Sequence, residues 1–201
     1  MLTKITKLNV DWLDVKNECR NTINKEISTK EPTSDFKKKL LISEHSPIRL
    51  LEVKWRWGKI KSWISVHFAR HWLGWDKWIS TQREDRTGVD RDNLPQNTLV
   101  NYDGKGNAQA LINVARYRLC IGAAHPETRK YMEDLKITLS QYETEISNVL
   151  VPNCIYRAGC SEFTSCGYYE KFKKFCEDNN ICIDTIQERY DAYNLFFYKN
   201  K

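Results

Sequence analysis

The chain of 201 residues contains no apolar run long enough to cross a bilayer. Residues 1–7 also lack the apolar stretch and the cleavage site of a secretion signal. The seven cysteines are an odd number, which excludes a complete set of internal disulfides and favours a reducing compartment. We therefore expect a cytoplasmic protein without a membrane partner.

The cysteines also lack the two-residue gap that is typical of zinc ribbons. Cys154, Cys160 and Cys166 instead recur every six residues. Small buried thiols are the usual explanation for such residues, so we expect no metal. A metal or iron–sulfur site at these three cysteines is the alternative.

The composition is that of an ordinary globular protein, with 41% hydrophobic and 29% charged residues. The length fits one domain, so we expect residues 1–201 to form a single domain. The net charge of +6 favours an anionic ligand such as a nucleotide, a nucleic acid or a membrane surface. Trp72 and Trp75 are expected to pack in the core, with stacking on a planar ring as the alternative.

Hydrophobic periodicity predicts few strands, several helices and no regular alternation of the two, which is typical of an α+β fold. Residues 25–39 and 83–102 are expected to be polar connections, and Gly58 is expected to end a strand. Strands are predicted at residues 5–10 and 51–57, and helices at 12–24, 63–72, 107–120, 127–147, 167–179 and 185–198.

The strand at residues 51–57 alternates cleanly between apolar and charged residues. Trp55 and Trp57 are predicted on its buried face, and Lys54 and Arg56 on its exposed face. A half-buried strand shows this pattern without any ligand. The segment rich in lysine and tryptophan therefore does not by itself indicate nucleic-acid binding, and we regard nucleic acid as an unlikely partner.

The helix at residues 107–120 is the best-defined element, because its apolar residues form a single stripe. Asn113 lies away from this stripe and is a candidate ligand-binding residue. An amide at such a position could instead bond a backbone group. The stripe consists of Ala108, Leu111, Ile112, Ala115 and Leu119.

Polar donors are concentrated in two neighbouring stretches. Arg70 and His71 end the helix at 63–72, and a donor-rich segment follows at residues 80–86. Arginine supplies forked charged donors, and serine or threonine hydroxyls fill the remaining acceptor positions of a phosphate. These stretches are therefore candidates for binding a phosphate monoester.

Three ordered blocks between Glu44 and Arg129 resemble motifs of the flavin-dependent thymidylate synthases, the ThyX family. The first is the turn at residues 44–47. The second, residues 70–83, is similar to the family pattern Arg-His-Arg-x-x-Ser-x-Asn-Glu-x-Ser-x-Arg-Tyr, with its last arginine displaced by one place to Arg83. The third comprises residues 107–118 and 124–129, similar to Asn-Ala-Arg-Ser-Leu-x-Asn-Phe-x-x-Leu-Arg followed by Ala-Gln-x-Glu-Ile-Arg.

The resemblance implies a ThyX-like domain with a small antiparallel sheet and surrounding helices, in a bacterial or phage-type protein. The implied activity is reductive methylation of dUMP to dTMP. Methylenetetrahydrofolate would supply the carbon, reduced FAD the hydride, and NADPH would reduce the flavin. The family has no side chain that acts as a covalent nucleophile, and it forms homotetramers with active sites between subunits. Residues 150–201, which contain five cysteines, would be a C-terminal extension outside the strongest match.

The resemblance also assigns candidate site residues. Those for dUMP are His67, Arg70, Ser80, Gln82, Arg83 and Arg118. Those for FAD are Ser46, Arg70, His71, Asn107 and Asn113.

Two departures from the family pattern leave the function open. Arg49 stands where the family often has glutamate, and Trp78 stands where its motif has glutamate. Both changes remove an acceptor and would alter flavin binding. One alternative is a variant that transfers a hydroxymethyl group to dUMP. The other is a catalytically inactive ThyX-like protein that binds a nucleotide or nucleic acid.

Overall fold

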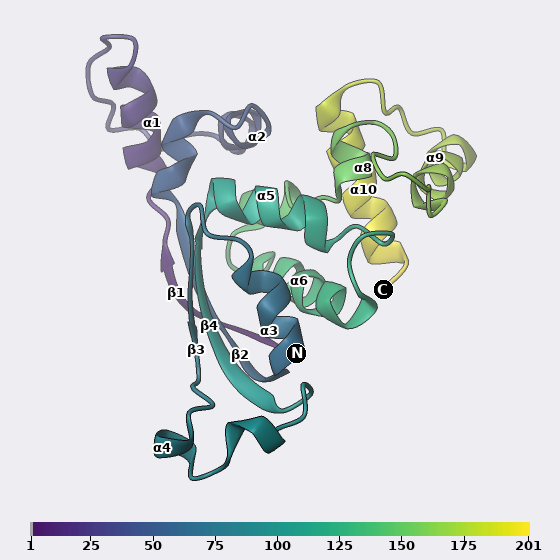
Figure 1. The fold of residues 1–201 in the computed structure, drawn as a ribbon. Helices are drawn as coiled ribbons and strands as arrows, with labels where there is room; N and C mark the ends of the chain where they lie inside the picture. Colours follow the sequence, from purple (N-terminus) through teal and green to yellow (C-terminus); the bar gives the residue numbers. More distant parts are fainter. Residues whose placement is uncertain (1) are drawn as a thin grey trace.

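The computed structural model describes residues 2–201 and shows an α+β fold in which helices cover one face of a small antiparallel sheet (Figure 1). The predicted fold class is confirmed. The strands are β1 (Thr3–Asn9), β2 (Glu52–Lys61), β3 (Trp75–Ile79) and β4 (Leu99–Asn107), in the order β1-β2-β4-β3. The helices are α1 (Trp12–Asn21), α2 (Ser34–Ile42), α3 (Ser62–Ala69), α4 (Glu84–Thr87), α5 (Ala108–Arg118), α6 (Pro126–Leu139), α7 (Thr144–Asn148), α8 (Asn153–Tyr156), α9 (Tyr168–Asp178) and α10 (Ile186–Lys199), with 3-10 turns η1 (Ser46–Leu50) and η2 (Arg91–Asn93).

The predicted alternation of β2 is confirmed. Trp55 and Trp57 are fully buried against the helices, whereas Lys54 and Arg56 lie on the opposite face. The Trp55 ring packs edge-on against that of Trp75, with 4.7 Å between the ring centroids. An aromatic core therefore fixes the inner face of the sheet.

Gly104 is required where β4 passes under the Trp55 ring. A Cβ atom added at Gly104 would lie 2.3 Å from a carbon of that ring, inside van der Waals contact. Gly104→Ala is therefore expected to lower the free energy of unfolding by about 1–3 kcal/mol, measured by urea denaturation. Gly58→Ala is the matched control, because an added Cβ there meets no atom closer than 3.9 Å. Equal stability of the two variants would contradict this account of the packing.

Several predicted boundaries are wrong. Gly58 does not end β2, which continues to Lys61, and the loop expected at residues 83–102 gives way to β4 from Leu99 onward. The apolar alternation of β4 covers only Val100 and Tyr102, because glycines occupy its next two inward positions, 104 and 106. The structure also adds β3 and α2 and ends α3 at Ala69. It divides the helix predicted at 127–147 into α6 and α7.

The stripe predicted for α5 is confirmed, since all five of its residues are buried. Asn107 caps this helix, and its Oδ1 accepts a hydrogen bond from the Ala110 amide at 2.9 Å. The helices predicted at 167–179 and 185–198 correspond to α9 and α10 within one residue at each end. Among residues 2–201, no helix combines the length and apolar character needed to span a membrane.

Candidate functional site

The turn at residues 70–74 packs against the start of α5, which in turn is bonded to the end of η1. It joins α3 to β3, and the Asn107 amide donates to the Gly74 carbonyl at 3.0 Å. Gly74 has φ +66° and packs so closely on Asn107 that an added Cβ would lie 2.4 Å from its Nδ2. The Ala108 amide in turn donates to the Leu51 carbonyl at 2.9 Å, which ties the start of α5 to the end of η1. The turn is therefore held firmly against the start of α5.

Two cavities flank this turn and share Leu73 and Asn113 in their walls. The side chains of Trp72 and Leu73 are each 71% exposed beside them. Trp75 is buried as predicted, but the prediction that Trp72 packs in the core is wrong, because the turn projects it into solvent. A cavity of about 160 Å³ is lined by Arg70, His71, Trp72, Leu73, Asn113 and Val114. A second, of about 330 Å³, is lined by Arg49, Leu73, Gly74, Asn107, Gln109 and Asn113.

Arg118 reaches from the end of α5 to the end of α3. Its Nε donates to Nε2 of His71 at 3.0 Å, and its Nη2 donates to the His67 carbonyl at 2.6 Å. A guanidinium can only donate, so Nε2 of His71 must be the acceptor and the imidazole proton lies on Nδ1. Arg70, His71 and Arg118, predicted from separate motifs, are thus brought together.

This group of residues is strongly cationic. Burial, and then the charges of Arg118 and Lys77, lower the pKa of His71 to about 4. Burial and the charge of Arg70 lower the pKa of Arg118. Among residues 2–201, neither arginine nor Lys77 takes part in an ion pair. Such uncompensated positive charge is suited to an anionic ligand.

His71 is expected to stay neutral down to about pH 4, whereas an unfolded histidine takes up its proton near pH 6.5. The unfolded state therefore binds more protons between these values, and the free energy of unfolding should decrease as the pH falls from 6.5 to 4. NMR titration of the imidazole tests the pKa directly. In the control His71→Asn, this part of the pH dependence of stability should disappear. An imidazole that titrates near pH 6.5 would contradict the arrangement.

His67 lies beside this group but lines neither cavity. Its Nδ1 is 2.8 Å from the hydroxyl of the buried Thr128, in α6. Burial and then the charges of Arg118, Arg70 and His125 lower its pKa. In this chain His67 therefore links α3 to α6.

The residues predicted for FAD are only partly brought together. His71 and Asn113 line the cavities, and Asn113 borders both of them. The Oδ1 of Asn107 is already engaged as the helix cap. Ser46 is exposed at the start of η1 and lines neither cavity, whereas Arg49 of the same turn does.

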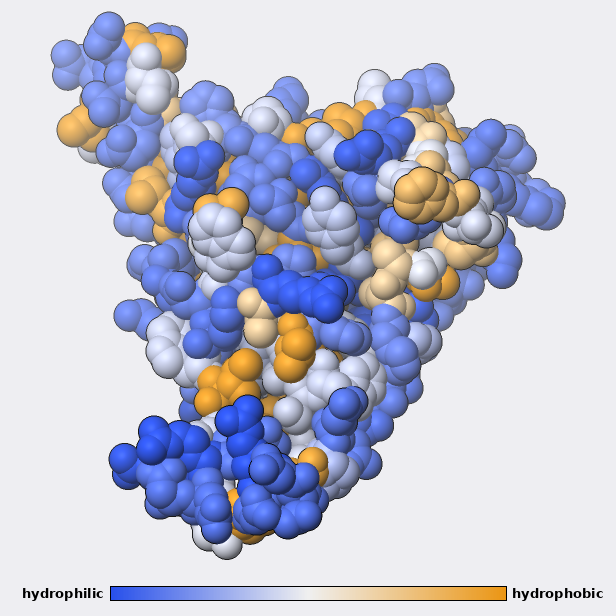
Figure 2. Space-filling model, viewed as in Figure 1, coloured by the Kyte–Doolittle hydropathy of each residue, from blue (hydrophilic) through white to orange (hydrophobic). Residues whose placement is uncertain are grey.

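The donor-rich segment lies at the other end of the sheet. Ser80 bonds to Asn101, whereas Gly74 bonds to Asn107, six residues further along β4. Six strand residues span about 20 Å. Figure 2 shows the projection around α4, near the lower end of the sheet, as strongly hydrophilic. Ser80, Gln82 and Arg83 therefore lie away from the two cavities within one chain, and the Arg83 guanidinium pairs with Asp85 at 2.9 Å.

The sequence interpretation noted Arg49 only as a departure from the family pattern, and it missed Gln109 as a cavity-lining residue. Gln109 could have been found from spacing. Gln109 precedes Asn113 by four residues on one helix, so the two share a face.

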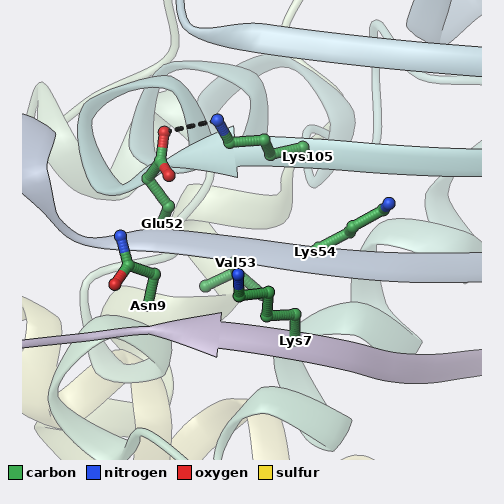
Figure 3. Close-up of a pocket in the computed structure, with 6 residues that line it drawn as sticks. All are labelled: Lys7, Asn9, Glu52, Val53, Lys54 and Lys105. Carbon is green, nitrogen blue, oxygen red and sulfur yellow. Dashed lines mark ion pairs between the residues drawn. The ribbon is translucent and has the colours of Figure 1, made fainter.

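Another cavity, of about 240 Å³, lies on the open face of the sheet (Figure 3). Lys7 and Lys54 line it, and the carboxylate of Glu52 pairs with Lys105 at 2.7 Å within it. Trp78 lies on the same face, with the Lys54 ammonium 5.2 Å from its ring centroid. None of the predicted site residues lines this cavity, so it is not the candidate site.

The cysteines of the C-terminal part are all free. Burial, followed by the neighbouring thiols, raises the pKa of Cys154 to about 12, so this thiol is protonated near neutral pH. Cys160 and Cys166 are exposed. Over residues 2–201, no group of three or more histidine, cysteine or acidic side chains is arranged to hold a metal ion.

No family model matches the sequence, and no curated protein matches it either. A solved structure does match: the UMP/dUMP methylase PolB from Streptomyces cacaoi, bound with 5-Br dUMP. The TM-score is 0.57 at 14% sequence identity, over 73% of this chain and 93% of that chain. This chain therefore has the fold of a solved UMP/dUMP methylase.

Proposed function

We propose that this protein is a flavin-dependent thymidylate synthase, which methylates dUMP to dTMP with methylenetetrahydrofolate as carbon donor and NADPH as reductant. The observation that supports it best is the cluster of Arg70, His71 and Arg118, which has no acidic partner among residues 2–201. Arg70 and His71 of this cluster line a cavity on this fold. The solved protein that shares the fold is a methylase of UMP and dUMP, which favours the same substrate class.

In this proposal the two guanidiniums bind the phosphate of dUMP. Arg118 uses two of its N–H groups to hold its own position, and three remain for a ligand. The His71 Nδ1–H is a neutral donor beside them. Exposed Trp72 offers a flat apolar face for a planar ring. These side chains bind and orient the substrate, and none has to act as a nucleophile.

The donor set also suits FAD, which would supply a hydride when bound. Arg70, His71 and Asn113 would hold it, and they present guanidinium, imidazole and amide donors around the shared wall of the cavities. Ligand pockets usually measure about 300–1,000 Å³, so neither cavity alone is ample for a dinucleotide. We propose that a homotetramer completes the site, with the segment of Ser80, Gln82 and Arg83 reaching a neighbouring copy.

A catalytically inactive nucleotide-binding protein is the second candidate. Trp78, which replaces a motif glutamate, lies on the open face of the sheet and is 54% exposed. It offers no acceptor to a flavin in the cavities.

Two measurements on the purified protein test these candidates. An absorbance spectrum with added FAD, with and without dUMP, should show a bound flavin that responds to dUMP. Incubation of C5-tritiated dUMP with methylenetetrahydrofolate, FAD and NADPH should then release tritium. The mass of the product separates a methyl from a hydroxymethyl group. Binding of dUMP without flavin uptake or tritium release would reject both transfer reactions in favour of the inactive protein.

A further inference from the structure

We infer that Arg49 forms a second anion-binding subsite, in the 330 Å³ cavity, which takes a phosphate or pyrophosphate group of a second nucleotide. The inference rests on the proposed function only for the identity of the ligand at the neighbouring subsite. The juxtaposition of Arg49 with the amide of Asn113 in the wall of this cavity carries it.

The backbone around Arg49 is held in place by buried neighbours. Ile48 and Leu51 are fully buried, and Pro47 is buried at the start of the same turn. The Leu51 carbonyl accepts from the first amide of α5. Arg49 itself is exposed between these anchors and lines the cavity. Its guanidinium is thus presented from a fixed turn rather than from a loose loop.

No acidic side chain lines this cavity, and among residues 2–201 no ion pair involves Arg49. The carboxylate of Glu44 contacts Gln109, but it is already paired with Arg116. The Arg116 guanidinium in turn lies 3.6 Å from the centroid of the Tyr156 ring, which fixes the pair. The charge of Arg49 is therefore not neutralised by any side chain that the structure describes.

The available donors match a phosphate. A guanidinium presents parallel N–H groups that suit two phosphate oxygens at once. Asn113 adds an amide, whose Oδ1 faces Gln109 and Arg116 at 3.4 and 3.5 Å. Its Nδ2 therefore remains available to an acceptor in the cavity.

The two subsites are neighbours rather than copies of one site. They share Leu73 and Asn113, and each contains its own arginine, Arg49 in one and Arg70 in the other. An acidic residue at position 49 would repel an anion there. Arg49 therefore favours an anionic group in the 330 Å³ cavity, and it does not line the neighbouring cavity that contains Arg70.

Calorimetric titration of the full chain with inorganic pyrophosphate, with and without saturating dUMP, tests the subsite. Arg49→Ala is expected to weaken pyrophosphate binding at least tenfold, and Arg49→Glu to abolish it, while the affinity for dUMP stays within twofold. Arg91→Ala, an exposed arginine on η2, is the matched control and should bind as the wild type does. The melting temperatures of all variants should agree, because the Arg49 side chain has no hydrogen-bond or ion-pair partner to lose within the part of the chain that the structure describes.

Unchanged pyrophosphate affinity in Arg49→Ala would overturn the subsite, and so would a wild type that does not bind pyrophosphate. Competition identifies the source of the anion. Displacement by FAD assigns the subsite to a pyrophosphate bridge, displacement by AMP alone assigns it to a phosphate monoester, and displacement by neither overturns it. A wild type that fails to bind dUMP would refute the proposed function, while the pyrophosphate titration without dUMP would still test Arg49.

Discussion

Arg118→Ala is expected to weaken dUMP binding by about ten- to a hundredfold, because a charge-assisted contact contributes about 1.5–3 kcal/mol. The structure shows how the Arg118 guanidinium is held in place. Two of its bonds, to His71 and to the His67 carbonyl, fix the guanidinium before any ligand arrives. In the proposed complex, its remaining N–H groups would bind the phosphate without further ordering of the side chain.

The measurement is calorimetric titration with dUMP, supported by a thermal melt that shows the variant is folded. Arg118→Lys is the informative comparison. A lysine keeps the charge but cannot reproduce the two fixed bonds, so an intermediate loss of affinity is expected. The pKa of His71 should also rise in Arg118→Ala, because a neighbouring cation is removed. Wild-type affinity for dUMP in Arg118→Ala would show that the phosphate binds elsewhere.

The free energy of unfolding should rise steeply with pH above neutrality because of Lys136. This side chain in α6 is fully buried, and its ammonium donates to the Ser147 carbonyl and to Oδ1 of Asn194, each at 2.7 Å. The ammonium also lies near the rings of Tyr193 and Phe197, and no carboxylate is among these contacts. Burial therefore lowers its pKa from 10.5 to about 7.

Between pH 7 and 10.5 the unfolded state holds a proton that the folded state releases, so stability increases with pH by up to about 1.4 kcal/mol per unit. Urea denaturation of the wild type and of Lys136→Met at pH 7 and pH 9 isolates the effect. Surface tyrosines and cysteines titrate in both proteins and cancel in the difference. We expect the stability of the wild type relative to the variant to increase by about 2 kcal/mol between these pH values. A difference that does not depend on pH would mean that Lys136 keeps its proton when folded.

The parts of the fold that the sequence predicted well have strong local patterns. The stripe of α5 and the alternation of β2 each repeat with the period of their element, and both are buried as expected. β4 shows such a pattern only at Val100 and Tyr102. Its glycines at 104 and 106 are determined by the rings of Trp55 and Trp75, which come from other strands. A sequence window contains no information about those partners.

Some of the predicted site residues meet in the structure, and others do not. The family resemblance selected Arg70, His71 and Arg118, and the structure joins them because α3 and α5 end side by side. The same resemblance also selected Ser80 and Arg83, which the extended strand β3 carries about 20 Å away. Spacing along the chain does not measure distance once a strand intervenes.

The sequence alone therefore determined the class of fold, the buried faces of its most regular elements and the donor-rich stretches suited to an anion, because each depends on residue type and short-range period. Arg118 was identified only through the family resemblance. Only the tertiary structure decided which of those groups meet, that Asn107 is used as a helix cap, and that Arg49 enters the cavity. These outcomes depend on contacts between segments far apart in the chain, and packing rather than local preference sets them.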